Sequence, residues 1–352
     1  MRDVAVIGFA EAPNVRHTGG TTNGVEMLVP IFHEVLAQTG LARTDIGFWC
    51  SGSSDYLAGR AFSFVSAVDA IGAFPPVMES HVEMDGAWAL YEAWVKVLTG
   101  EVDTALAYGF GKSSAGNLRR VLALQLDPYT VAPLWPDSIS IAALQARLGI
   151  EAGRWSEQQM AGVAARSRAA AVGNPRAQLS GEVTADELLA APYIADPLRA
   201  HDCAPVTDGA AVVILAAGDR ARELCERPAW IQGIEHRIES HHPGYRDLTD
   251  SPSTRSAAEK VGGVGTFDVA ELMVTHSHEE IILRQALGLG DDTVVNPSGG
   301  PLGGHPVMAT GLVRVIEAAN RIADGSAQRG LAHASSGACL QQNLICVLQG
   351  DD

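Results

Sequence analysis

Short apolar runs alternate with longer amphipathic runs along most of the chain. A short apolar run predicts a buried β-strand, and a run whose apolar residues recur every three or four positions predicts a helix. The predicted strands cover residues 3–8, 46–50, 103–109, 211–216, 230–235, 271–275, 292–296, 329–334 and 343–348. The predicted helices cover residues 23–39, 59–72, 85–99, 139–147, 157–170, 218–225, 278–287 and 307–323. Strands and helices that alternate in this way are typical of an α/β protein.

Residues 112–150 and 171–207 form a long excursion between strands. Proline recurs through it, at positions 128, 133, 136, 175 and 192. Loops of this length inside a compact domain usually serve as lids or interface elements. We therefore expect the excursion to take part in function.

The same order of landmarks appears twice in the chain. Each landmark in the second set lies 225 positions after its counterpart (311 − 86, 325 − 100 and 331 − 106). Glycines open and end an apolar helix, and a leucine marks the strand that follows, at Gly86, Gly100 and Leu106 and again at Gly311, Gly325 and Leu331. The repeat predicts two similar α/β halves that meet near Gly218, each placing the start of a buried helix near a common centre.

The composition excludes several classes of protein. The chain has 352 residues, with 25 Lys and Arg against 41 Asp and Glu, which gives a formal charge of −16. A chain this acidic, without a basic tract, is not expected to bind duplex DNA or an anionic membrane. Hydrophobic residues make up 47% and charged residues 19%. These proportions allow a large core and exclude global disorder.

Three further features favour a cytoplasmic location. No run approaches the ~18–20 apolar residues that a membrane-spanning helix needs. Residues 1–8 match a short strand better than a signal peptide. The five cysteines are scattered, odd in number and without a Cys-x-x-Cys pair. They argue against a disulfide framework or structural zinc and favour a reducing compartment.

Residues 296–311, NPSGGPLGGHPVMATG, are the strongest candidate for a functional loop. Dense glycines let a backbone approach a ligand closely and direct N–H groups into a site. We therefore interpret Asn296, Gly299, Gly300 and Gly304 as substrate-binding residues, and His305 as a catalytic candidate. On spacing alone, a structural turn with an incidental histidine is the alternative.

The motif Asn-x-x-Gly-Gly…Gly-His-Pro-x-x-Ala-Thr-Gly in this loop resembles the second-half signature of the thiolase superfamily. Its nearest resemblance is to sterol-carrier-protein-type thiolases and lipid-transfer-protein-like homologues, including actinobacterial members found with steroid-degradation genes. Residues 202–211, DCAPVTDGAA, resemble the segment that closes the first half in that family. Residues 335–343, SSGACLQQN, stand where its last catalytic loop precedes the final strand. The resemblance extends over residues 3–350.

The resemblance implies an α/β thiolase fold, in which two duplicated halves, each a five-stranded mixed sheet with helices, stack as five layers (αβαβα). The halves would be residues 1–218, including the excursion at 112–207, and residues 219–352. It also implies an active site where the helix N-termini of the two halves meet. CoA thioesters bind there in the family, usually in a dimer.

Glu83 marks a departure from the family. Thiolases place a nucleophilic cysteine three residues before the glycine that opens the first buried helix, and here that position is Glu83. A carboxylate cannot replace a thiolate in forming an acyl-enzyme thioester. We interpret Glu83 and Asp85 as catalytic candidates, with a general base or a carboxylate in the lost nucleophile's pocket as the role. The alternative is that both only stabilise the N-terminus of a helix.

His276 follows a predicted strand, and the resemblance implies that it acts with His305. Together they would form an oxyanion site for the enolate oxygen of an acyl-CoA. Two hydrogen-bonded histidines near a domain seam are the alternative. We predict no metal at His276 and His278, because no third and fourth ligand stand at the usual spacing.

The loop before the last strand supplies two more candidates. Cys339 lies near the position of the family's acid/base cysteine, and Gly337 is interpreted as substrate-binding. A buried structural cysteine is the alternative for Cys339.

These residues favour retro-aldol cleavage of a steroid or lipid β-hydroxyacyl-CoA, because that reaction needs a base and an oxyanion hole but no covalent nucleophile. Coenzyme A would be part of the substrate, and no bound cofactor is expected. The alternatives are an acyl-CoA acyltransferase or thiolase, and a non-catalytic thiolase-like subunit that supports a paralogue. The resemblance implies a homodimer or a heteromer with a second thiolase-like chain, together with a small OB-fold/zinc-ribbon partner. Glu83, His276, His305 and Cys339 should share one pocket.

Overall fold

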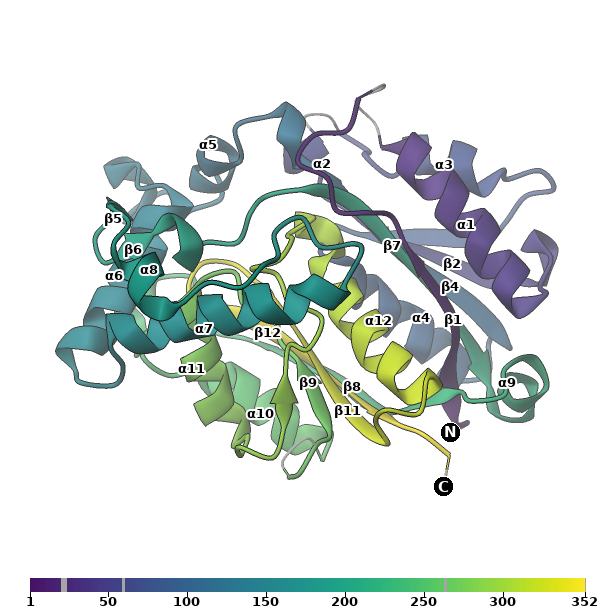
Figure 1. Ribbon diagram of the computed structural model, residues 1–352. Helices are drawn as coiled ribbons and strands as arrows, with labels where there is room; N and C mark the ends of the chain where they lie inside the picture. Colours follow the sequence, from purple (N-terminus) through teal and green to yellow (C-terminus); the bar gives the residue numbers. More distant parts are fainter. Residues whose placement is uncertain (20–23, 59–60, 263–264, 352) are drawn as a thin grey trace.

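The computed structural model describes residues 1–19, 24–58, 61–262 and 265–351 (Figure 1). Its strands are β1 Val4–Glu11, β2 Phe48–Gly52, β3 Glu79–Val82, β4 Thr104–Lys112, β5 Tyr193–Ala195, β6 Leu198–Arg199, β7 Asp208–Ala217, β8 Ala229–Ile238, β9 Val269–Glu271, β10 Val294–Val295, β11 Arg329–Ser336 and β12 Gln342–Gln349. Its helices are α1 Val25–Thr39, α2 Asp55–Ala58, α3 Val65–Ile71, α4 Gly86–Leu98, α5 Leu118–Ala123, α6 Ser138–Glu151, α7 Glu157–Ala170, α8 Ala185–Leu189, α9 Gly218–Leu224, α10 Pro252–Lys260, α11 Ser277–Leu287 and α12 Thr310–Ala323. The α/β class predicted from the sequence is confirmed.

Ten strands form one mixed sheet in the order β10-β9-β11-β12-β8-β1-β7-β4-β2-β3. Read outward from the centre, β8-β12-β11-β9-β10 and β1-β7-β4-β2-β3 have the same arrangement of parallel and antiparallel neighbours. The two half-sheets are joined by β1 and β8, which pair only at Ala5 with Trp230 and Val6 with Ala229. The repeated strand order matches the repeat of landmarks in the sequence.

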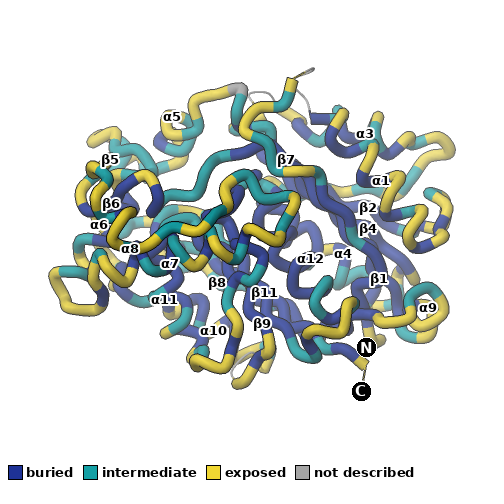
Figure 2. Tube along the Cα trace, viewed as in Figure 1, coloured by how far each residue is buried: buried dark blue, intermediate teal, exposed yellow. Residues whose placement is uncertain are grey.

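Helices fill the space on both faces of the half-sheets and between them (Figure 1). One buried cluster joins α1 and α3 to one face of the first half-sheet, through residues such as Phe32 and Tyr108. A second cluster places α4 and α12 between the two half-sheets. A third covers the far face of the second half-sheet with α10 and α11. The result is the five-layer αβαβα arrangement, and Figure 2 shows α12, in its middle layer, buried along most of its length.

The long excursion leaves the first half and packs on the second. Helix α7 matches the predicted helix at 157–170, and a capping box between Ser156 and Gln159 fixes its start. Met160 and Ala164 of α7 share a buried cluster with Leu283 of α11. The excursion therefore covers the outer face of the second half.

Several elements differ from the prediction. The strand expected at 271–275 is instead β9 Val269–Glu271, which begins two residues earlier and overlaps the expected range only at Glu271. The strand expected at 292–296 is the shorter β10 Val294–Val295. Part of the helix expected at 59–72 lies outside the described residues, and α3 Val65–Ile71 is its described part. Helix α10 and edge strand β3 were not predicted, because their residues are mostly polar and show no clear apolar period.

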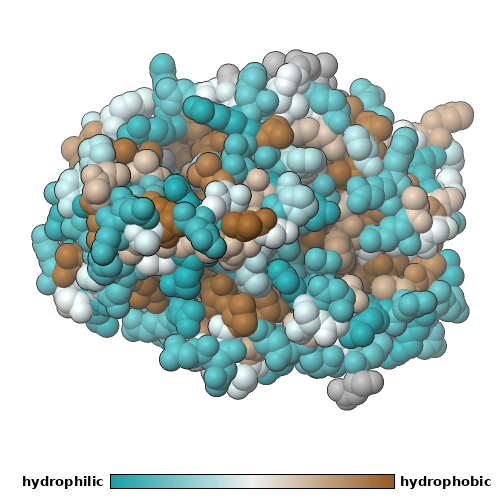
Figure 3. All heavy atoms as spheres, viewed as in Figure 1, coloured by the Kyte–Doolittle hydropathy of each residue, from teal (hydrophilic) through white to brown (hydrophobic). Residues whose placement is uncertain are grey.

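The visible face of the molecule is mostly hydrophilic, with apolar side chains scattered among polar ones (Figure 3). Within the described part of the chain, no helix combines the length and apolar character needed to cross a bilayer.

Candidate active site

The site begins where the two central helices meet. Asp85 is the N-cap of α4, and its Oδ1 accepts a hydrogen bond from the backbone N–H of Ala87 at 2.8 Å. The same carboxylate accepts from the N–H groups of Gly311 (2.8 Å) and Leu312 (3.1 Å) in α12. Only glycine fits at position 311, because a Cβ there would lie 2.6 Å from Asp85 Oδ1 and 2.5 Å from Ala334 Cβ. One carboxylate thus holds both helix starts together.

Burial raises the pKa of Asp85 to about 7, against the opposing effect of the hydrogen bonds that it accepts. The side chain is almost fully enclosed. Its carboxylate oxygens accept hydrogen bonds from three backbone N–H groups at helix starts. These contacts are those of a carboxylate that stabilises helix N-termini, the alternative to a catalytic role.

A cavity of about 520 Å³ lies at this junction. Six of the candidate residues line it, namely Glu83, Asp85, His276, His305, Gly337 and Cys339. Apolar side chains of the excursion form one wall, from Leu118, Leu122, Leu126, Val131, Ile139 and Ile141. The volume and mixed lining are in the range of small-molecule sites.

Glu83 reaches the cavity from the link between β3 and α4. Its Oε1 accepts a hydrogen bond from the backbone N–H of Asp55, at 2.7 Å, where α2 begins. Glu83 is exposed, whereas Asp85 two residues later is buried. The two carboxylates therefore differ in kind: Asp85 is enclosed as a cap, and Glu83 faces the open space of the cavity.

His276 is held by the start of α11. It is the N-cap residue, and Glu279 stands at the third helical position of a capping box. The imidazole Nδ1 lies 3.2 Å from Glu279 Oε1 and 3.1 Å from Thr275 Oγ1. Burial lowers the pKa of His276, but hydrogen bonds with Cys203 and Glu279 outweigh it and raise the pKa to about 10. His276 is therefore an imidazolium at neutral pH.

Glu279 is the counter-ion of this imidazolium. Burial raises the pKa of Glu279, but the hydrogen bond and charge of His276 lower it to about 2. Its Oε2 also accepts the backbone N–H groups of Thr275 (2.7 Å) and His276 (3.0 Å). The carboxylate fixes both the orientation and the charge of the ring.

His305 has the opposite protonation state. Its Nδ1 lies 2.8 Å from Oγ1 of Thr310, in the first turn of α12. Burial and the nearby charge of His276 lower the pKa of His305 to about 4. The cavity therefore presents one cationic and one neutral imidazole.

A short segment, residues 203–207, connects the two histidines. Cys203 pairs with His276 in an antiparallel bridge, and Val206 pairs with His305 in a parallel bridge. Ala204 N donates to Thr275 O at 2.8 Å, and His305 N donates to Pro205 O at 3.1 Å. Three residues of extended chain span at most about 11 Å. This segment therefore places the backbones of both histidines beside one strand-like run.

Cys339 lies in an apolar cluster with Ile141 and Leu248. Burial raises the pKa of its thiol to about 12, and the sulfur lies 3.8 Å from Ile141 O. Arg246 holds its loop by donating to the carbonyl oxygens of Ala338 and Cys339, both at 2.9 Å. The thiol is protonated at neutral pH, as expected of the structural alternative.

Four residues of the glycine-rich loop do not line the cavity: Asn296, Gly299, Gly300 and Gly304. Asn296 Oδ1 accepts from Leu272 N at 2.6 Å. An added Cβ at Gly299 would meet Ala171 at 2.5 Å, and one at Gly304 would meet Asn14 at 3.1 Å. These close approaches are to protein rather than to a ligand. The loop's glycines instead allow the excursion and the N-terminal segment to pack against it.

A cluster of buried charges lies behind this loop. Arg314 forms an ion pair with Glu271 at 2.5 Å and donates to Ser298 Oγ at 2.8 Å. Burial, and then the charge of Glu317, raise the pKa of Glu11 to about 8. This cluster supports the loop but is not part of the cavity lining.

His278 points away from the cavity. Its Nε2 lies 3.0 Å from Gln145 Oε1, and burial lowers its pKa to about 3. Among the described residues, no three His, Cys, Asp or Glu side chains are grouped so as to hold a metal.

Two cavity residues, Cys203 and Glu279, were not predicted from the sequence. The spacing of Glu279 from His276 is that of a capping box, which could have identified it. Cys203 carried no local signal, because its facing residue lies 73 positions away (276 − 203).

Comparisons with known proteins show what the chain is similar to in sequence and in fold. No family model matches it. It is 28% identical to an acetyl-CoA acetyltransferase of Methanothermobacter thermautotrophicus, over 90% of each chain. It is 28% identical to sterol carrier protein 2 of Gallus gallus over 70% of its own length, and spans about half (54%) of that protein. It is 25% identical to the benzoylsuccinyl-CoA thiolase subunit BbsB of Thauera aromatica, over 53% of this chain and 57% of the relative.

A solved structure described as an Ltp2-ChsH2(DUF35) aldolase has the same fold. It superposes with a TM-score of 0.79 at 18% identity and covers 98% of this chain and 97% of its own. Together with the duplicated five-layer architecture, this match shows that the chain has a thiolase-like fold. The sequence relatives and the solved structure support its resemblance to the thiolase superfamily and to the lipid-transfer-protein-like branch.

Proposed function

We propose that this protein acts on acyl-CoA thioesters and catalyses retro-aldol cleavage of a β-hydroxyacyl-CoA. One observation carries the proposal: the cavity has a pair of imidazoles suited to an oxyanion, but a carboxylate, Glu83, where the family has its nucleophilic cysteine. The relatives named for acyl-CoA chemistry, and the fold shared with an aldolase, support it.

The reaction would begin with the thioester carbonyl oxygen directed at His276 and His305. Glu83 takes the proton from the β-hydroxyl group, the bond between Cα and Cβ breaks, and Cβ leaves as a ketone or aldehyde. The electron pair moves into the thioester as an enolate. The His276 imidazolium stabilises the oxygen's new charge, and neutral His305 can donate a hydrogen bond through Nε2. Protonation at Cα completes the acyl-CoA product.

The wall of apolar side chains from the excursion indicates the substrate class. Leu118, Leu122, Leu126 and Ile139 present aliphatic surface to the cavity, which favours a bulky apolar acyl group of the steroid or lipid kind. We also propose a homodimer or a heteromer with a second thiolase-like chain, as the family resemblance implies. A small OB-fold/zinc-ribbon partner of the DUF35 kind is proposed as well, since the solved structure with the same fold is described as an Ltp2-ChsH2(DUF35) aldolase. A cytoplasmic location remains a prediction.

Two other functions have a specific observation in their favour. The acetyl-CoA acetyltransferase relative favours acyl transfer. The absence of a cysteine at position 83 favours a non-catalytic subunit that binds acyl-CoA for a paralogue. Acyl transfer would require another cysteine of the cavity to carry the acyl group in place of residue 83. A purely supporting subunit would not need a charged and a neutral histidine on one cavity.

The test is to incubate the purified protein, alone and with a DUF35 partner, with a β-hydroxyacyl-CoA bearing a large apolar group at Cβ. Mass spectrometry should detect the ketone and the shortened acyl-CoA in equal amounts. Transfer of the acyl group to free CoA or acetyl-CoA would instead show the acyltransferase. Binding of acyl-CoA without any turnover, in every combination, would favour the supporting subunit.

A further inference from the structure

Cys203 faces His276 across a narrow pair of strand segments. The flanking hydrogen bond, from Ala204 N to Thr275 O at 2.8 Å, makes Cys203 and His276 a non-hydrogen-bonded antiparallel pair. In such a pair the two Cβ atoms stand on the same face, about 4.5–5.5 Å apart. Both side chains line the cavity. The thiol therefore lies beside the imidazole and open to a substrate.

The other side of the imidazole is already occupied. Nδ1 contacts Glu279 Oε1 at 3.2 Å and Thr275 Oγ1 at 3.1 Å, which leaves Nε2 for the cavity side and for Cys203. A carboxylate that orients and charges a histidine, with a thiol on the histidine's far side, is the usual environment of a reactive cysteine. The imidazolium would stabilise a thiolate whenever Cys203 loses its proton.

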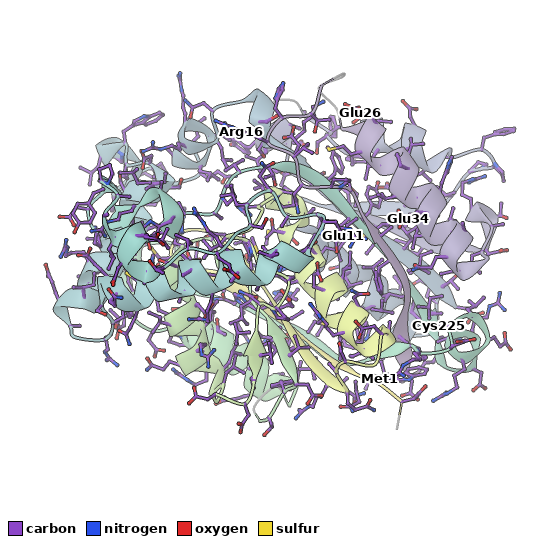
Figure 4. The ribbon with its side chains drawn as sticks, in the orientation of Figure 1. Met1, Glu11, Arg16, Glu26, Glu34 and Cys225 are labelled. Atoms are coloured by element: carbon purple, nitrogen blue, oxygen red, sulfur yellow. The ribbon has the colours of Figure 1, made fainter. Side chains whose placement is uncertain are left out.

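The other cysteines lack this environment. The thiol of Cys339 packs against Ile141 and Leu248, and the other half-buried cysteine, Cys225, follows α9. Figure 4 labels Cys225 beside α9, at the opposite end of the molecule from α5 and α6, which border the cavity. Cys50 and Cys346 are fully buried.

We propose that Cys203 is the acid that protonates the enolate carbon after cleavage, and the base that removes the same α-proton in the reverse direction. This inference rests on the proposed site for a CoA thioester. In the forward step the S–H bond of Cys203 breaks, a C–H bond forms at Cα, and the resulting thiolate is held by the His276 imidazolium. The thiolate recovers a proton through cavity water from Glu83, which took one from the β-hydroxyl group, so no proton is consumed overall.

Exchange of α-protons tests this role without any carbon–carbon cleavage. Wild-type protein should incorporate deuterium at Cα of propionyl-CoA in D₂O, as followed by mass spectrometry. Cys203→Ala should slow the exchange by about 10²-fold or more, the scale of one general acid–base group, while propionyl-CoA still binds in calorimetry. Cys225→Ala is the matched control and should exchange at the wild-type rate. Equal exchange by Cys203→Ala and wild type, or no exchange by the wild type, would overturn the proposal.

Alkylation by iodoacetamide gives a second readout that is independent of the substrate. Peptide mapping at pH 7.5 should show Cys203 labelled at least about tenfold faster than Cys225, because His276 stabilises the attacking thiolate. Glu279→Gln should reduce the labelling of Cys203 and leave Cys225 unchanged. Equal labelling of both cysteines in the wild type would also overturn the proposal. Exchange and fast labelling without cleavage would reject the retro-aldol reaction but retain the role of Cys203.

Discussion

The Asp85 carboxylate in the first half of the chain accepts a hydrogen bond from the backbone N–H of Gly311 in the second half, with 2.8 Å between Oδ2 and N. The same group caps its own helix at Ala87. Residues of the two halves thus share one cap, 226 positions apart (311 − 85). The cavity lies directly beside this shared cap.

Replacing Asp85 should therefore cost stability in both halves. Asp85→Ala leaves three buried N–H groups without their acceptor, and we expect a loss of about 3 kcal/mol in the free energy of unfolding. Urea denaturation followed by circular dichroism measures it. Asp219→Ala removes an exposed carboxylate from the first turn of α9 and should change stability by less than about 0.5 kcal/mol. Equal stability of the two variants would contradict the shared cap.

Glu279→Gln should lower the pKa of His276. In the wild type the ring stays charged up to about pH 10. Without the carboxylate, the charged form should be lost nearer the ordinary value of about 6.5. The cleavage rate should then fall by about tenfold between pH 6 and pH 8, whereas the wild-type rate should not. NMR titration of the imidazole measures the pKa directly. Glu280→Gln, on the same helix but outside the cavity lining, should leave the titration of His276 unaltered.

His305→Ala removes the neutral member of the imidazole pair. Loss of one oxyanion donor typically costs about 10²–10³ in rate, and we expect that loss in single-turnover cleavage. Cys339→Ala should cost less, because its buried thiol is protonated and lies in an apolar cluster. The reverse order of effects would point to a thiolase instead. Circular dichroism checks that both variants fold.

Glu83→Gln keeps the shape of the side chain but removes its basic oxygen. Cleavage should slow by about 10²-fold or more, the usual contribution of a general base. The amide oxygen can still accept the hydrogen bond from Asp55 N, so the thermal stability should change little. A variant that cleaves at the wild-type rate would exclude Glu83 as the base.

Glu11 should make the protein less stable as the pH rises. Its pKa is raised to about 8 in the folded chain, against about 4.3 for an ordinary glutamate. The folded state therefore binds the proton more tightly, and this contribution is present below about pH 4 and is lost as the pH rises through 8. At pH 8 Glu11→Gln should be more stable than the wild type by at least ~1.4 kcal/mol, the equivalent of one pKa unit. Glu34→Gln, at an exposed position of α1 that is labelled in Figure 4, should show no such gain.

The long regular elements could be predicted from the sequence because their local patterns are strong. Strand β7 is apolar along nearly its whole length, and α7 begins with a capping box. Strands β9 and β10 contain only three and two residues, too few for a period to fix their ends. Helix α10 is long enough, but its residues are mostly polar and show no clear apolar period, so it was not predicted.

The site was only partly predictable. His276 and His305 came from the family motif, and Glu83 from its departure. The glycine-rich loop was interpreted as substrate-binding, but its Asn296, Gly299, Gly300 and Gly304 do not line the cavity. Glycines that admit a ligand and glycines that admit Ala171 or Asn14 look the same in a sequence. Cys203 depends on a single bridge between distant segments, and such pairings are set by the assembled fold.

The segment from Cys203 to Thr207 sets the spacing of the two histidines through its length, not through its side chains. It belongs to the first half of the chain, while both histidines belong to the second. One residue added or removed here would shift one pairing point by about 3.3 Å relative to the other, more than a shared hydrogen-bond acceptor can tolerate. Homologues that keep this chemistry should therefore keep Cys203 and the length of the segment, but can vary in the residues at 204–207. Engineering of the site can change what the four positions after Cys203 present to the substrate, provided that no insertion or deletion is made in the segment.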